Sequence, residues 1–181
     1  TLSPDYYFPG CGVQVQEMLE MRTVPALDVR NQCSGFVYAL STADQFIKTG
    51  MYKNILVIGS ENHSGGLDMT TRGRSVSVIF GDGAGAAVLT REEDNGILST
   101  HLHSEGKHAL ELSLKGPSTM EWVPELIEKD PQEDIPYYPY MNGQFMFKNA
   151  VVRFAEVIQE GLAQNKLTAA DIDMLIPHQA N

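Results

Sequence analysis

Hydrophobic residues follow a helical period over residues 34–48 and form strand-like runs on either side of it. The helical positions are Phe36, Val37, Leu40, Ala43 and Ile47. Apolar residues alternate over 25–30 and are unbroken over 55–58, which is typical of strands. The order strand, helix, strand predicts a βαβ unit, so we expect a parallel sheet and an α/β fold.

A second helical pattern starts at residue 143. Its apolar positions are Phe147, Ala150, Val151, Phe154, Val157, Ile158, Gly161 and Leu162. Charged residues fall on the other face, so the pattern predicts an amphipathic helix whose apolar stripe packs on a core. Shorter patterns predict a helix over 9–21, a capping box over 168–171, and strands over 76–80, 84–90, 96–103 and 173–176.

Residues 105–141 interrupt this regular order of elements. They hold five of the nine prolines, and eight acidic against three basic side chains. Such a stretch predicts a surface insertion, with a short helix around Met120–Glu128. Loops of this length are often functional lids, but a solvated excursion is an equal alternative.

Composition and charge narrow the classes of protein. The chain has 181 residues, 43% of them hydrophobic, and a net charge of −10. This size fits one domain or half of a larger protein, and the acidic charge argues against nucleic-acid binding. No apolar run is long enough to span a membrane, and residues 1–8 do not resemble a signal peptide. Since the chain starts at Thr1 and stops just after an apolar run, we expect a fragment.

Two cysteines, Cys11 and Cys33, are too few for a disulfide scaffold and lack metal-site spacing. We therefore expect free thiols, a reducing cytoplasm and no bound metal. Cys33 lies between a predicted strand and a predicted helix, so its sulfur would lie at a helix N-terminus. The helix dipole there favours an anion, which lowers the pKa of a thiol and makes it a nucleophile. The competing interpretation is a buried, inert cysteine.

His178 follows the last predicted strand, and ligands of α/β sheets bind at such strand ends. A nucleophilic cysteine needs a base or proton shuttle, and a histidine distant in sequence can meet it in space. The alternative is an exposed loop histidine.

Two further patterns are weaker. Residues 81–86 have the spacing of a dinucleotide-binding loop, but a turn follows too soon for a crossover helix, which favours strand, turn and strand. His101 and His103 share one face of a predicted strand, where solvated histidines are commoner than metal ligands.

Five blocks of sequence, taken together and in order, resemble the β-ketoacyl-[acyl carrier protein] synthase III family of thiolase-fold condensing enzymes. The blocks are Phe8–Gln16, Ala26–Phe36, Phe80–Leu89, Met141–Lys148 and Ile176–Asn181. The resemblance implies a thiolase-like layered α-β-α-β-α fold that is incomplete in this chain. It also implies that residues 1–94 are the latter part of the N-terminal half and residues 95–181 the first part of the C-terminal half.

The resemblance assigns roles to single residues. It matches Cys33 to the nucleophile that accepts the acyl group, and His178 to the histidine that assists decarboxylation of a malonyl group. It places Phe8 across a homodimer, closing the partner's acyl pocket. Met146, Phe147, Ala180 and Asn181 match positions beside the pantetheine arm, and Lys148 matches a basic position that meets the acyl carrier protein.

The reaction implied is an acylation of Cys33 by an acyl-coenzyme A, followed by decarboxylative condensation with malonyl-carrier protein to give a 3-oxoacyl product. Coenzyme A and phosphopantetheine thioesters are then substrates, with no permanently bound cofactor. The family's catalytic asparagine lies beyond Asn181, and residues 30–32 before Cys33 are bulkier and more polar than in many members. A Cys–His acyltransferase or thioester hydrolase that does not decarboxylate, and a non-catalytic dimerisation domain, are the alternatives.

Overall fold

The computed structural model describes residues 1–93, 96–114 and 138–180. The chain forms two compact units, of which the first comprises Thr1–Asn62 and Asp82–Leu102. The second unit comprises His63–Gly81 and His103–Asn181. Cys33 belongs to the first unit and His178 to the second, so each half of the candidate site is described within its own unit. The boundary between residues 94 and 95 that the resemblance implies stays a prediction.

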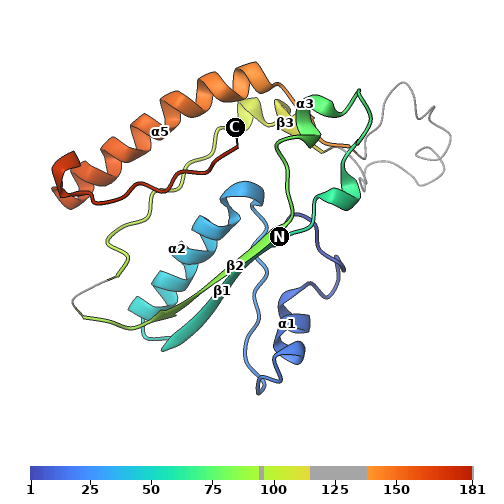
Figure 1. The fold of residues 1–181 in the computed structure, drawn as a ribbon. Coiled ribbons are helices and arrows are strands. Elements are labelled where there is room, and N and C mark those ends of the chain that lie inside the picture. Colours follow the sequence, from blue (N-terminus) through green and yellow to red (C-terminus); the bar gives the residue numbers. More distant parts are fainter. Residues whose placement is uncertain (94–95, 115–137, 181) are drawn as a thin grey trace. The chain divides into compact units, whose positions relative to one another are not determined.

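The first unit is built around a two-stranded antiparallel ladder (Figure 1). Its elements are α1 (Gly12–Met18), the 3-10 turn η1 (Gln32–Ser34), α2 (Gly35–Lys48), β1 (Asn54–Glu61) and β2 (Gly83–Thr90). The register runs from Asn54 opposite Thr90 to Glu61 opposite Gly83. Helix α2 ends at Lys48, followed by Gly50 in the left-handed region at φ 78°, as a glycine after a helix end often does.

Helix α2 packs on one face of β1, and this contact makes the core of the first unit. Ala43 and Ile47 on the helix and Val57 on the strand are buried. A Cβ on Gly59 would lie 3.2 Å from the ring of Phe36, so the missing side chain lets helix and strand approach closely. The N-terminal end of α2 is therefore held beside the C-terminal end of β1.

The second unit contains short elements and one long helix. They are the 3-10 turns η2 (Ser64–Gly66), η3 (Gly106–His108) and η4 (Ala169–Asp171), helix α3 (Arg74–Ser77), strands β3 (Leu112–Ser113) and β4 (Tyr140–Met141), and helix α5 (Gly143–Asn165). Strands β3 and β4 pair antiparallel and join the two described ends of the predicted insertion. The short helix predicted around Met120–Glu128 lies outside the described residues.

A buried carboxylate organises the loop before α3. Asp68 accepts hydrogen bonds from the backbone N–H and hydroxyl of Thr70 at 3.0 and 2.7 Å, and from Nε of Arg72 at 2.6 Å. These donors favour the ionised form and hold the pKa of Asp68 below its usual value, with the Thr70 hydroxyl as the largest cause. A Cβ on Gly73 would collide with the backbone oxygen of Asp68, so glycine is required for this close approach.

The helices predicted over 34–48 and from residue 143 were confirmed. Helix α2 spans residues 35–48 of the predicted 34–48, and α5 begins at the predicted Gly143. The predicted capping box is present, since the Asp171 carboxylate accepts from the N–H and hydroxyl of Thr168 at 2.8 and 2.7 Å. The helix predicted over 9–21 is shorter, because α1 covers only Gly12–Met18.

Several strand predictions were wrong. Residues 25–30, 96–103 and 173–176 form no strand, and residues 74–77 are the helix α3 instead of the start of a strand. The predicted parallel βαβ pairing is also absent among the described residues, where the ladder formed by β1 is antiparallel. An apolar run becomes a strand only beside a neighbouring strand, which periodicity alone cannot reveal. The strand predicted over 84–90 is β2, so residues 81–86 lead into a strand and not into the helix of a dinucleotide-binding loop.

The apolar stripe of α5 is not the core face that its period predicted. No residue of α5 is buried, and Phe147, Val151 and Phe154 are exposed. Ala150, Val157, Ile158, Gly161 and Leu162 are half-buried. A helical period reports an apolar face, but burial requires a partner of matching area, and the described part of the second unit supplies that partner for only part of the stripe.

Candidate active site

Cys33 lies in the middle of η1, at the point where an extended segment turns into α2. Gln32 makes the turn with φ 45°, in the left-handed region. The side chain of Asn31 donates to Oγ of Ser34 at 2.9 Å, and that hydroxyl donates to the backbone oxygen of Asn31 at 3.1 Å. These two hydrogen bonds stabilise the turn around Cys33. The predicted position of Cys33 just before a helix N-terminus is confirmed, although no strand precedes it.

The expected effect on the thiol was wrong. The pKa of Cys33 is raised above its usual value. Desolvation by neighbouring protein atoms is the largest cause, the backbone hydrogen bond at Cys33 opposes it, and the negative charge of Glu61 adds to it. The residue as a whole is exposed, so a reagent can reach it while the sulfur is poorly hydrated. Cys33 is therefore held as a thiol, and a reaction that uses it must remove the proton.

Phe8 is the most exposed aromatic side chain of the described residues, at 90%. It precedes a cis peptide bond to Pro9 and then Gly10, whose φ of 104° suits glycine. The segment after it is fixed, because the backbone N–H of Gly12 donates to the Asp28 carboxylate at 2.9 Å. The structure thus presents Phe8 to solvent on a braced loop of the first unit.

The pantetheine positions taken from the resemblance lie in the second unit. Met146 is the fourth residue of α5 and is half-buried, and Phe147 is the fifth and is exposed. The helix start is well fixed, since the Asn142 side chain accepts from the N–H of Phe145 at 3.2 Å and donates to the Glu111 carboxylate at 2.8 Å. His178 and Ala180 follow η4 in an exposed segment without regular structure, and Asn181 lies outside the described residues.

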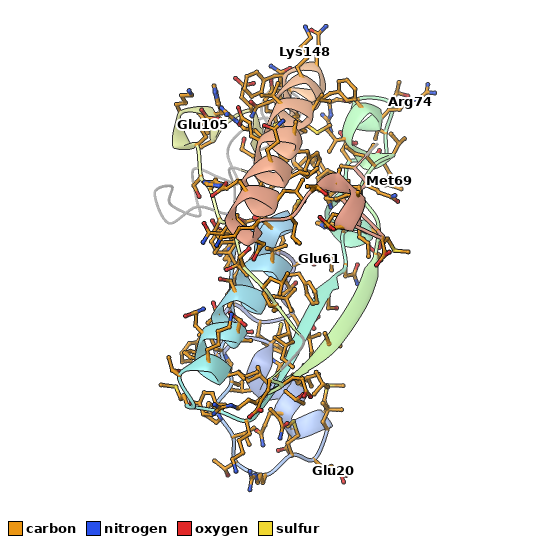
Figure 2. The ribbon with its side chains drawn as sticks, turned by 90° about the vertical axis from the view of Figure 1, so that its left-hand side faces the viewer. Glu20, Glu61, Met69, Arg74, Glu105 and Lys148 are labelled. Carbon is orange, nitrogen blue, oxygen red and sulfur yellow. The ribbon has the colours of Figure 1, made fainter. Side chains whose placement is uncertain are left out.

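The basic residues on α5 differ in their surroundings. Arg153 donates to the Glu105 carboxylate at 2.8 and 3.0 Å and to Glu156 at 2.6 Å, and Lys107 pairs with Glu105 at 2.7 Å. These partners lower the pKa of Glu105, Lys107 being the largest cause, and raise that of Arg153, Glu156 being the largest cause. Lys148 is exposed at the start of the helix, and no ion pair joins it to another described residue (Figure 2). The charge of Arg153 is compensated locally, whereas that of Lys148 is available.

The other candidate patterns carry no site in the described part of the chain. His101 bonds to the Ser99 hydroxyl at 2.8 Å, and His103 pairs with Glu160 at 2.6 Å. No group of metal-binding side chains occurs among the residues described. Within the same residues, no helix combines the length and apolar character that a membrane crossing requires.

Comparison with known proteins finds similarity to one family over the whole chain. Residues 27–106 match the sequence model of the family described as 3-oxoacyl-[acyl-carrier-protein (ACP)] synthase III. The chain is 45% identical over 181 residues to the β-ketoacyl-[acyl-carrier-protein] synthase III of Aliivibrio fischeri, and 48% identical over 187 residues to that of Rhodospirillum centenum. Each match covers 100% of this chain and 53% of the relative, so the chain spans about half the length of the curated relatives it matches.

Solved structures agree with the sequence comparison. The crystal structure of 3-oxoacyl-[acyl-carrier-protein] synthase III from Aquifex aeolicus superimposes with a TM-score of 0.84 at 39% identity, covering 99% of this chain and 52% of that one. A priming β-ketosynthase of the R1128 polyketide pathway gives a TM-score of 0.83 at 28% identity, covering 99% and 51%. The thiolase-like α/β fold class expected from the sequence is confirmed as a partial fold, and over its whole length the chain is similar to β-ketoacyl-[acyl carrier protein] synthase III proteins.

Proposed function

We propose that this chain is part of an enzyme that joins an acyl group to a malonyl unit with loss of carbon dioxide. The observation that carries the proposal is the elbow at Cys33, which lies within the 27–106 family match and presents an exposed thiol at the start of α2. The product is a 3-oxoacyl thioester on a carrier protein, as used to start a fatty acid or polyketide chain.

In the first half-reaction, the Cys33 thiol loses its proton and its sulfur attacks the carbonyl of an acyl-coenzyme A. Backbone N–H groups at the elbow stabilise the oxyanion, and coenzyme A leaves as its thiol. Because the pKa of Cys33 is raised, the site must supply a group that accepts the thiol proton. This step leaves an acyl group on Cys33 and involves no oxidation or reduction.

In the second half-reaction, malonyl-carrier protein loses carbon dioxide and its α-carbon attacks the acyl carbonyl. A carbon–carbon bond forms, and the Cys33 thiolate is the leaving group. We assign to His178 the stabilisation of the negative charge that develops on the malonyl thioester as carbon dioxide departs. Met146, Phe147, Ala180 and Asn181 are proposed to line the path of the pantetheine arm. No permanently bound cofactor is needed for either half-reaction.

The proposed partners follow from the same assignment. We infer a homodimer in which Phe8 closes the partner's acyl pocket, and its 90% exposure on a braced loop supports this role. The two free thiols support a cytoplasmic location, where disulfides are rare. The carrier protein is expected to dock near Lys148.

Release of carbon dioxide tests the proposed reaction directly. The full-length protein should release labelled carbon dioxide from [carboxyl-¹⁴C]malonyl-carrier protein in proportion to the 3-oxoacyl product formed. Consumption of acyl-coenzyme A with transfer to water, an alcohol or an amine, and no carbon dioxide, would identify an acyltransferase or hydrolase and overturn the proposal.

A charge reversal tests the docking site. Carrier proteins are acidic and this chain carries −10, so attraction must come from local cations such as Lys148, which forms no ion pair with another described residue. Lys148→Glu should lower kcat/KM for malonyl-carrier protein by roughly tenfold at low salt, the lower end of electrostatic steering. The defect should shrink at high salt, and acylation by acyl-coenzyme A should be unchanged.

The matched control is Lys166→Glu, which makes the same charge change at the exposed C-cap of α5. It should leave carrier-protein kinetics near those of the wild type. Equal effects of the two substitutions, or none from Lys148→Glu, would show that the carrier protein docks elsewhere.

A further inference from the structure

Glu61 ends β1 on the face that α2 covers. Side chains alternate along a strand, so Glu61 points to the same face as Gly59, which lies against the ring of Phe36. Phe36 follows Cys33 by three residues, within the first turn of the helix. The strand register therefore brings the Glu61 carboxylate to the N-terminal end of α2, where the elbow at Cys33 lies.

The carboxylate is fixed in this place by the chain's first residues. It accepts hydrogen bonds from the backbone N–H of Leu2 at 2.7 and 2.9 Å and from the N–H and hydroxyl of Ser3 at 3.2 and 3.0 Å. The Ser3 hydroxyl in turn accepts from the N–H of Asn62 at 2.8 Å. Figure 2 shows Glu61 at the end of the strand. The segment that leads to Phe8 is thus tied to the strand that lies beside Cys33.

The nearest opposing charge is the α-ammonium of Thr1, which lies 3.9 Å from the Glu61 carboxylate. Glu61 is the only ionisable side chain on β1, and β2 has none. The charged residues of α2, Asp44 and Lys48, pair with each other at 2.8 Å near its far end. Before the elbow, the Arg30 guanidinium lies 5.9 Å from the ring centre of Tyr7, and the Asp28 carboxylate accepts from Gly12.

We propose that Glu61 is a positioning residue for Cys33, whose carboxylate ties the segment before Phe8 to β1 and favours the protonated form of the neighbouring thiol. The negative charge disfavours a thiolate nearby, in agreement with the raised pKa of Cys33, to which Glu61 contributes. The inference rests on Cys33 as the proposed nucleophile. It assigns to Glu61 an effect on the equilibrium between thiol and thiolate at Cys33, beyond the two residues proposed to perform the chemistry.

The effect of Glu61 on the ionisation of Cys33 can be measured without any substrate. Iodoacetamide alkylates Cys33 in the full-length protein, and peptide mapping separates this product from alkylated Cys11. Glu61→Gln keeps an oxygen acceptor for Leu2 and Ser3 but removes the charge. The midpoint of the rate against pH should move to lower pH, and the rate at neutral pH should rise. The plateau at high pH should fall slightly, because a thiolate of lower pKa is less nucleophilic.

Two variants separate charge from structure. Glu61→Asp keeps the charge and should keep the midpoint near that of the wild type. Glu20→Gln makes the same change in net charge on the segment after α1, which Figure 2 shows well away from Glu61, and should leave the profile unchanged. An unshifted midpoint in folded Glu61→Gln, or an equal shift in Glu20→Gln, overturns the proposal.

A second measurement needs no substitution and decides the matter if Glu61→Gln fails to fold. Raising the salt concentration from about 10 mM to about 1 M shortens the Debye length from roughly 30 to 3 Å. Screening of the partly exposed Glu61 carboxylate should lower the alkylation midpoint of wild-type Cys33, and a midpoint independent of salt would overturn the proposal. Since neither measurement uses acyl-coenzyme A or malonyl-carrier protein, failure of the proposed condensation is detected separately.

Discussion

Cys33→Ala will abolish covalent labelling of the full-length protein by radiolabelled acetyl-coenzyme A. The sulfur at the elbow before α2 is the proposed acyl acceptor, and alanine leaves no atom there that can form a thioester. Loss of a nucleophile typically lowers turnover by about 10⁴-fold or more, so condensation should fall to the background rate. The amount of label is measured by scintillation counting of the precipitated protein. Mass spectrometry then identifies the labelled peptide.

The second cysteine of the chain provides the matched control. Cys11 is half-buried at the start of α1, and no described contact gives it a catalytic role. Cys11→Ala should accept about the same amount of label as the wild type. Label that persists in Cys33→Ala, or that disappears in Cys11→Ala while the protein stays folded, would contradict the assignment of Cys33.

The position of Cys33, the proposed nucleophile, could be predicted from local sequence. The apolar period that starts just after Cys33 determined where α2 begins, and a helix start is a property of neighbouring residues. The same reasoning found the start of α5 and the capping box at Thr168 and Asp171. Local signals therefore placed Cys33 at a helix N-terminus, and Phe147 and Lys148 near the start of α5.

The electrostatic state of that cysteine could not be predicted in the same way. A helix N-terminus alone predicts a lowered thiol pKa, whereas desolvation and the charge of Glu61 raise it. Glu61 reaches the elbow only through the register of β1 against α2, and it is 28 residues away in the sequence. The sequence analysis did not single out Glu61, and an acidic residue at the end of an apolar run is a signal that could have found it.

The failed strand predictions have the same cause. Residues 25–30 and 173–176 have the composition of strands, but no neighbouring strand pairs with them among the described residues. Val76 became the buried residue of a short helix because the Asp68 turn and Gly73 fix the chain just before it. Pairing partners are set by the tertiary fold, so an apolar run alone identifies neither a strand nor a buried segment, and residues 173–176 are exposed.

His178→Ala is expected to separate the two half-reactions. A group that stabilises charge only as carbon dioxide leaves is not needed when Cys33 takes the acyl group from coenzyme A. The variant should therefore still be labelled by acetyl-coenzyme A at close to the wild-type rate. Condensation with malonyl-carrier protein should fall by roughly 10²–10⁴-fold, the usual contribution of a positioned acid–base or charge-stabilising group.

Rapid-quench labelling measures the first half-reaction, and release of labelled carbon dioxide measures the second. His103→Ala is a suitable control, because His103 is exposed and pairs with Glu160 on α5, so both rates should stay near those of the wild type. An equal loss of labelling and condensation in His178→Ala would show that His178 removes the proton from Cys33. Because the raised pKa of Cys33 means that a base must remove its proton, this second result would identify an alternative mechanism. In that mechanism His178 would be the base that deprotonates Cys33.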